Sequence, residues 1–171
     1  MDIHRLIRDV PDYPQPGIVF KDITPLLADS AALHHAVEAM SAPFAHANID
    51  LVAGIEARGF IFGPLVARHL DVGFMPVRKP GKLPADTTSV TYDLEYGSDT
   101  LEVHSDACGP ESSVLIVDDV LATGGTLAAA RTLVESMEAS IVGISVLVEL
   151  AFLEGRAKLD GIVTHAVVEV D

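Results

Sequence analysis

Two adjacent carboxylates followed by a loop of small residues form the most informative stretch of the chain. Residues 113–117 are largely apolar and predict a buried strand, which delivers Asp118 and Asp119 to the edge of a sheet. Residues 122–126 read Ala-Thr-Gly-Gly-Thr, and their small size lets backbone N–H groups approach an anion closely. A helix predicted directly after this loop adds the partial positive charge of its N-terminus. Because carboxylates accept hydrogen bonds from vicinal hydroxyls, the stretch suits a ligand with a phosphate beside a sugar diol.

Other strand-to-loop motifs fit this stretch less well. A P-loop needs Gly-Lys-Ser/Thr, and a Rossmann dinucleotide loop needs G-x-G-x-x-G, and neither pattern occurs here. A metal-binding acidic pair of the receiver-domain type stays possible, although such a site has no need of the small loop. An ordinary strand-to-helix turn would leave the ordered series of acids, glycines and threonines without a purpose.

Composition places the chain among single-domain globular proteins. It has 171 residues, of which 49% are hydrophobic, with one cysteine. This length suffices for a proper core, and a single cysteine excludes a disulfide scaffold and favours a cytoplasmic location. We expect no signal peptide, and the longest apolar stretch, residues 140–150, is too short to span a bilayer. The seven histidines show no metal-ligand spacing.

Charge is distributed unevenly along the chain. The net charge of -14 argues against nucleic acid or an anionic membrane as a partner. However, residues 58–82 carry five basic side chains and one acid, whereas residues 86–119 carry nine acids and no lysine or arginine. Positive charge is therefore concentrated in one segment, and the net charge does not exclude a small anionic ligand.

Hydrophobic periodicity predicts an α/β domain with a mostly parallel central sheet flanked by helices. Helices are predicted over residues 28–47, 60–70 and 125–139, and strands over residues 50–55, 73–77, 113–117, 141–148 and 162–170. Residues 92–95 and 100–104 flank Tyr-Gly-Ser-Asp at 96–99, which is typical of a hairpin. Ligands of such α/β folds bind at the carboxyl ends of the strands.

The stretch from 114 to 126 resembles the phosphoribosyl pyrophosphate (PRPP) motif of the type I phosphoribosyltransferases. Residues 16–27, 54–63, 78–84, 94–97, 150 and 153–156 narrow the resemblance to the adenine phosphoribosyltransferases. The resemblance implies one domain over residues 1–171, with a small hood (about residues 1–30 and 150–160) and a mobile two-stranded flap (about residues 84–106). It also implies transfer of the phosphoribosyl group from PRPP to N9 of adenine, giving AMP and pyrophosphate in purine salvage.

The same resemblance assigns the PRPP site to four sets of residues. Asp118 and Asp119 would contact the ribose hydroxyls. The 5′-phosphate loop would consist of Ala122, Thr123, Gly124, Gly125 and Thr126. A loop with a cis peptide expected between its first two residues would contact pyrophosphate through Glu56, Ala57 and Arg58. Positive charge that stabilises the leaving pyrophosphate would come from Arg78, Lys79 and Lys82.

The catalytic and base-binding residues follow from the resemblance as well. Glu95 would exchange a proton with the purine, Tyr96 would position it or pack the closed flap, and Arg58 is a second catalytic candidate. Flap closure would exclude water. Adenine would be bound by Ile18, Val19, Phe20, Lys21 and Leu153. Backbone groups there complement the amino group and N1 of adenine, and a 6-oxopurine would leave them unpaired at about 1–3 kcal/mol each.

The resemblance also implies a cofactor and a partner. Mg²⁺ would be held mainly by PRPP and water, with no direct protein ligand. The chain would form a homodimer with a pyrophosphate contact across the interface, and Lys21 stands where related chains often have arginine. Two alternatives stay open: a xanthine or other purine phosphoribosyltransferase, and a nucleotide-sensing relative without turnover. The presence of Glu95 and of the basic cluster counts against the second alternative.

Overall fold

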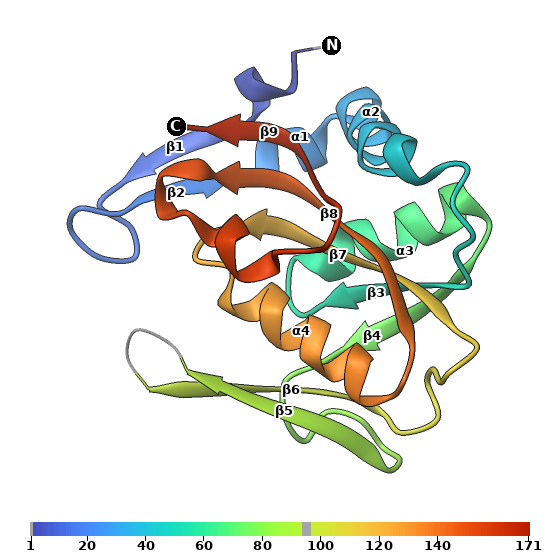
Figure 1. Ribbon diagram of the computed structural model, residues 1–171. Helices are drawn as coiled ribbons and strands as arrows, with labels where there is room; N and C mark the ends of the chain where they lie inside the picture. The colour runs from blue at the N-terminus through green and yellow to red at the C-terminus, as the bar shows by residue number, and fades with distance from the viewer. Residues whose placement is uncertain (1, 94–96) are drawn as a thin grey trace.

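A parallel five-stranded sheet forms the centre of the protein, for which the computed structural model describes residues 2–93 and 97–171 (Figure 1). In order across the sheet, the strands are β4 (Gly73–Val77), β3 (Leu51–Ile55), β7 (Ser113–Leu121), β8 (Ser140–Leu150) and β9 (Thr164–Val170). Every neighbouring pair in this sheet is parallel. The predicted α/β class with a parallel central sheet is therefore confirmed.

Helices cover both faces of the sheet. They are α1 (Thr24–Ala28), α2 (Ser30–Ser41), α3 (Gly59–Leu70) and α4 (Gly125–Ser136). The first three pack in one core with Val52 and Leu115, whereas α4 packs in the other with Ala53 and Ile116. Successive strand residues point to opposite faces, so the continuous apolar runs of β3 and β7 are buried on both sides. No described helix is long and apolar enough to cross a membrane.

Two antiparallel strand pairs and several short turns complete the fold. They are β1 (Arg8–Pro11) with β2 (Val19–Asp22), β5 (Thr87–Asp93) with β6 (Ser98–His104), and the 3₁₀ turns η1 (Ile3–Leu6), η2 (Ala42–Phe44), η3 (Ala151–Leu153) and η4 (Gly155–Leu159). Figure 1 shows β5 and β6 beside α4, and β1 and β2 near the carboxyl end of the sheet. These elements lie in the segments predicted for the flap and the hood.

Two predicted helices had wrong boundaries, each for a local reason. The helix predicted over residues 28–47 is divided at Asp29, whose carboxylate accepts hydrogen bonds from two amides in the first turn of α2, at 2.9 and 3.0 Å. The second part ends before Pro43, which has no N–H group to continue the helix. The last helix ends before the predicted Ala139, because Glu138 has a left-handed φ of 63°.

The strand predicted over residues 113–117 was too short. β7 continues through both carboxylates, because β8 pairs with it as far as the register of Leu121 with Glu149. The acidic pair therefore belongs to a central strand, in a stretch that pairs with β8 just beyond the end of the pairing with β3 at Val117, rather than to the loop that follows. A central strand is among the most rigid positions that the fold offers.

The predicted hairpin turn at residues 96–99 was displaced. In the β5–β6 pair, Asp93 lies opposite Ser98 and Tyr92 lies opposite Asp99, so the last two predicted turn residues belong to β6. This register places the side chains of Tyr92 and Asp99 on the same face of the hairpin.

Candidate active site

The acidic pair lies at the carboxyl end of β7 and is nearly inaccessible to solvent. The exposed fractions of Asp118 and Asp119 are 8% and 4%. Oδ1 of Asp118 accepts a hydrogen bond from the amide of Asp119 at 2.9 Å. Pairing of Asp118 and Val120 with β8 fixes the backbone on both sides of Asp119. The structure thus holds two carboxylates at one sheet edge in fixed orientations.

Arg58 connects this acidic pair to the strand β2. Its Nη2 atom lies 2.6 Å from Oδ2 of Asp119, and its guanidinium lies 4.8 Å from the ring centroid of Phe20. Nη1 donates to the carbonyl of Lys21 at 3.5 Å. Arg58 was predicted as a pyrophosphate donor, but the structure places its guanidinium between the acidic pair and the predicted base segment.

Burial sets the protonation preference of the two acids. It raises the pKa of Asp118 well above the usual value of an aspartate, and the neighbouring Asp119 carboxylate raises it further. Burial also raises the pKa of Asp119, against the lowering effect of Arg58. Oδ2 of Asp119 has this close ion pair but no hydrogen bond of good geometry within the described residues. The site therefore gains from a ligand that donates hydrogen bonds to the carboxylates.

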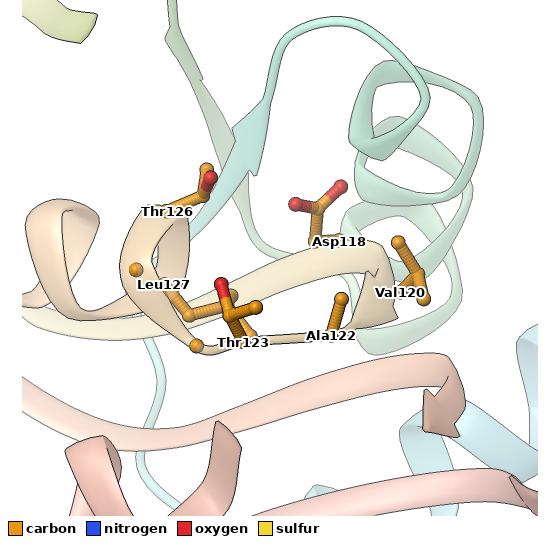
Figure 2. A pocket seen from close by; sticks show the side chains of 8 residues that line it. Asp118, Val120, Ala122, Thr123, Thr126 and Leu127 are labelled. Carbon is orange, nitrogen blue, oxygen red and sulfur yellow. The ribbon is translucent and has the colours of Figure 1, made fainter. Parts of the chain in front are cut away.

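A cavity of about 120 Å³ opens between Asp118 and the start of α4. It is lined by Asp118, Val120, Ala122, Thr123, Gly124, Gly125, Thr126 and Leu127. Figure 2 shows the Asp118 carboxylate on one side and the side chains of Thr123 and Thr126 on the other. No side chain caps α4, so the amides of its first turn remain as donors for an anion.

Two residues that the sequence did not single out join strands β5 and β6 to this cavity. The hydroxyl of Tyr92 on β5 lies 3.3 Å from the hydroxyl of Thr126 and donates to Oδ2 of Asp99 on β6, also at 3.3 Å. The hydrogen bond from Lys79 holds the pKa of Asp99 below its usual value. The pairing of Tyr92 with Asp99 could have been found from the sequence only with the correct hairpin register, and the register follows from the position of the turn.

The predicted basic cluster surrounds a carboxylate. Oε2 of Glu56 accepts from the amide of Lys79 at 2.9 Å and from Nε of Arg78 at 3.3 Å, while Lys82 pairs with Oε1. Burial would raise the pKa of Glu56, but the hydrogen bonds from Lys82 and from the Lys79 amide outweigh it and lower that pKa. The positive charge expected here is thus partly compensated. The peptide bond between Glu56 and Ala57 is cis, as the resemblance implied.

Most apolar side chains predicted to bind adenine are exposed, but Phe20 already contacts two other side chains. Ile18 and Val19 are exposed, and Leu153 is exposed at the end of η3. Phe20 instead packs edge-on against Tyr13, with ring centroids 5.3 Å apart, and lies against Arg58. The aromatic face predicted for adenine is therefore shared with a guanidinium.

Lys21, the last residue of the predicted base segment on β2, forms an ion pair. Nζ of Lys21 pairs with Oδ1 of Asp9 at 2.6 Å, so the amine binds a carboxylate of the neighbouring strand. Tyr13 and Phe152 are also exposed, and sequence reasoning did not select either of them. The predicted residues Glu95 and Tyr96 lie outside the described residues.

Comparison with known proteins identifies the family. A model of the phosphoribosyl transferase domain matches residues 25–167. A protein of Thermobifida fusca named adenine phosphoribosyltransferase is 57% identical over 168 residues, covering 98% of this chain and 96% of that one. The chain belongs to the adenine phosphoribosyltransferase family.

Solved structures of this family agree with the fold. The adenine phosphoribosyltransferase of Thermoanaerobacter pseudethanolicus superposes with a TM-score of 0.96 at 50% identity, covering 99% of this chain and 98% of that one. The Saccharomyces cerevisiae adenine phosphoribosyltransferase, crystallised with adenine and D-2,5-dideoxy-2,5-imino-altritol 1,6-bisphosphate, has a TM-score of 0.92 at 39% identity, with coverages of 97% and 96%.

Proposed function

We propose that this protein transfers the 5-phosphoribosyl group from PRPP to N9 of adenine, forming AMP and pyrophosphate. The observation that carries the proposal is the buried pair Asp118 and Asp119 beside a cavity formed by the N-terminus of α4. This arrangement offers acceptors for the ribose hydroxyls and donors for the 5′-phosphate. The adenine-bound yeast relative, at 39% identity, supports adenine as the acceptor base.

Holding the ribose at two points is the main contribution of the site. The acidic pair accepts hydrogen bonds from the 2′ and 3′ hydroxyls, and the loop from Ala122 to Thr126 binds the 5′-phosphate. Together they fix the position of the anomeric carbon, which converts the encounter with adenine into an effectively intramolecular step. Hydrogen bonds from the ribose hydroxyls then compensate the cost of burying the Asp118 and Asp119 carboxylates.

Pyrophosphate departure requires a change of partners in the basic cluster. Lys79 and Lys82 pair with Asp99 and Glu56 in the free chain. The pyrophosphate group of bound PRPP competes for these ammonium groups, which then neutralise the negative charge that develops on it as its bond to the anomeric carbon breaks and the bond to N9 forms. We further propose that a second copy of the chain supplies an additional pyrophosphate contact, as a homodimer.

The donor set of this site fits Mg²⁺ carried by the substrate. No group of three or more His, Cys, Asp or Glu residues gathers as a metal site in residues 2–93 and 97–171. Mg²⁺ ordinarily keeps several waters and substrate phosphate oxygens, so PRPP and water would hold the ion without a direct protein ligand. When bound, the ion neutralises negative charge on the pyrophosphate.

Release of pyrophosphate on mixing the protein with PRPP and a purine tests the function. We expect release with adenine and much slower release with hypoxanthine, guanine and xanthine, measured as initial rates. Faster release with xanthine or another oxopurine would assign a different purine specificity. Binding of PRPP without release for any purine would make the chain a nucleotide-sensing relative.

Replacement of Glu95 by glutamine tests the proposed proton transfer. We expect kcat to fall by about 10²-fold, the lower end of general acid–base contributions, with PRPP affinity unchanged. Single-turnover rates with adenine measure the chemical step directly. An unchanged kcat would remove Glu95 from the mechanism.

A further inference from the structure

The segment after β8 lies in backbone contact with the phosphate loop. A Cβ atom on Gly155 would lie 2.1 Å from the carbonyl oxygen of Ala122 and 2.8 Å from the amide nitrogen of Gly124. Conversely, a Cβ atom on Gly124 would lie 2.3 Å from the carbonyl oxygen of Gly155. The φ of Gly155 is not in the left-handed region, so the close approach alone requires glycine at this position.

An ion pair fixes this segment to the end of the sheet. Nε of Arg156 lies 3.0 Å from Oε1 of Glu149, and Nη2 pairs with Oε2. Nη1 also donates to the carbonyl of Thr164 on β9 at 2.6 Å. The guanidinium thus joins η4 to the last two strands of the sheet through a planar, two-point contact.

Glu149 connects this ion pair to the strand that leads into the phosphate loop. It is buried at the carboxyl end of β8 and lies opposite Leu121, the residue directly before the phosphate loop. Neither Glu149 nor Arg156 lines the phosphate cavity. The guanidinium is engaged by Glu149 and the carbonyl of Thr164, so it reaches the loop through the adjoining Gly155, whereas Glu149 also adjoins the loop through the pairing with Leu121.

We propose that Glu149 and Arg156 are positioning residues for the 5′-phosphate. Their ion pair holds Gly155 against Ala122 and Gly124, and this contact keeps the loop amides in the arrangement that binds the anion. The inference rests on the proposed function, because it names what supports the phosphate end of that same site. Anchoring on the central sheet makes this support as rigid as the strands themselves.

The test compares the two ends of PRPP separately, using ribose 5-phosphate and pyrophosphate as probes in calorimetric titrations of the full chain. Gly155→Ala and Arg156→Lys are expected to weaken ribose 5-phosphate binding at least tenfold and to change pyrophosphate binding less than twofold. The lysine keeps the charge but loses the two-point geometry. The matched control is Gly109→Ala, where an added Cβ meets no atom within 4 Å and both affinities should stay unchanged.

Each other result overturns the proposal. Unchanged ribose 5-phosphate binding in both folded variants would show that the contact is structural only. Equal weakening of both probes would indicate general loosening rather than positioning. Circular dichroism melting of each variant establishes that it is folded, and Arg156→Lys keeps the test open if Gly155→Ala fails to fold. A wild-type chain that binds neither probe would instead overturn the proposed phosphoribosyl site.

Discussion

The Asp118→Asn variant should lose most of its activity and yet be more stable than the wild type. We expect kcat/KM for PRPP to fall by about 10³-fold, because hydrogen bonds to a charged acceptor contribute about 1.5–3 kcal/mol each and the carboxylate offers more than one. The amide keeps one neutral acceptor oxygen but loses the other, since its NH₂ group donates where the ribose hydroxyl also donates. Steady-state rates at varied PRPP measure this loss.

The gain in stability follows from the raised pKa of Asp118. The folded-state pKa lies above that of the unfolded chain, so ionisation costs the folded state stability. Wild-type stability should therefore decrease as the pH rises from about 4 through the raised pKa. Asparagine removes this decrease, and Tm at neutral pH should rise by about 2–4 °C, the effect of roughly 1 kcal/mol in a chain of this size.

Asp106→Asn is the matched control for this prediction. Asp106 is exposed, so the same change of charge should leave both Tm and kcat/KM for PRPP nearly unchanged. The interpretation of Asp118 would be wrong if its variant kept wild-type activity. It would also be wrong if Tm fell, because that would mean that the free protein is stabilised by the buried charge.

The Gly124→Ala variant should be impaired in both folding and PRPP use. Gly124 has a φ of 77°, which costs an L-residue about 1–2 kcal/mol, and its added Cβ would lie 2.3 Å from the carbonyl oxygen of Gly155. Relief of this clash requires the loop to shift by roughly 1 Å, and such misplacement costs about 10²-fold in rate. Lost phosphate hydrogen bonds bring the expected fall in kcat/KM for PRPP to about 10³-fold.

Gly161→Ala separates the two causes. Gly161 has nearly the same φ, 80°, but an added Cβ there meets no atom within 4 Å. Its variant should show the stability cost of the backbone alone, about 1–2 kcal/mol in urea unfolding, with kcat/KM for PRPP close to wild type. Equal kinetics in the two variants would contradict the role assigned to the contact between Gly124 and Gly155.

The acidic pair and the small loop could be predicted because their residues are contiguous in the sequence. The strand, acids and small loop from 113 to 126 form one supersecondary unit, so their proximity follows from chain connectivity. Parallel strands place such units at one edge of a sheet, which made the location predictable too. The strand boundary was missed because backbone pairing between β7 and β8, rather than residue type, carries β7 past the acids.

Side-chain partners were harder to predict than the elements that carry them. Arg58 follows a strand in a turn, and sequence alone gives no reason to expect its ion pair with Asp119. Glu56 precedes the cis peptide, yet its carboxylate joins Lys82 from a different loop. Tyr92 meets Thr126 only because the β5–β6 pair packs beside α4.

The family, the α/β class and the segment proposed to bind phosphate could all be predicted from the sequence alone, since each depends on neighbouring residues or on a pattern with a fixed period. Which charges compensate one another, and which segment supports the loop, became visible only in the folded chain. Gly155 is 31 residues from Gly124 along the chain, and their contact exists because β8 and its ion pair bring the two backbones together. Contacts of this kind depend on the path of the whole chain, so they cannot be predicted from a local sequence pattern.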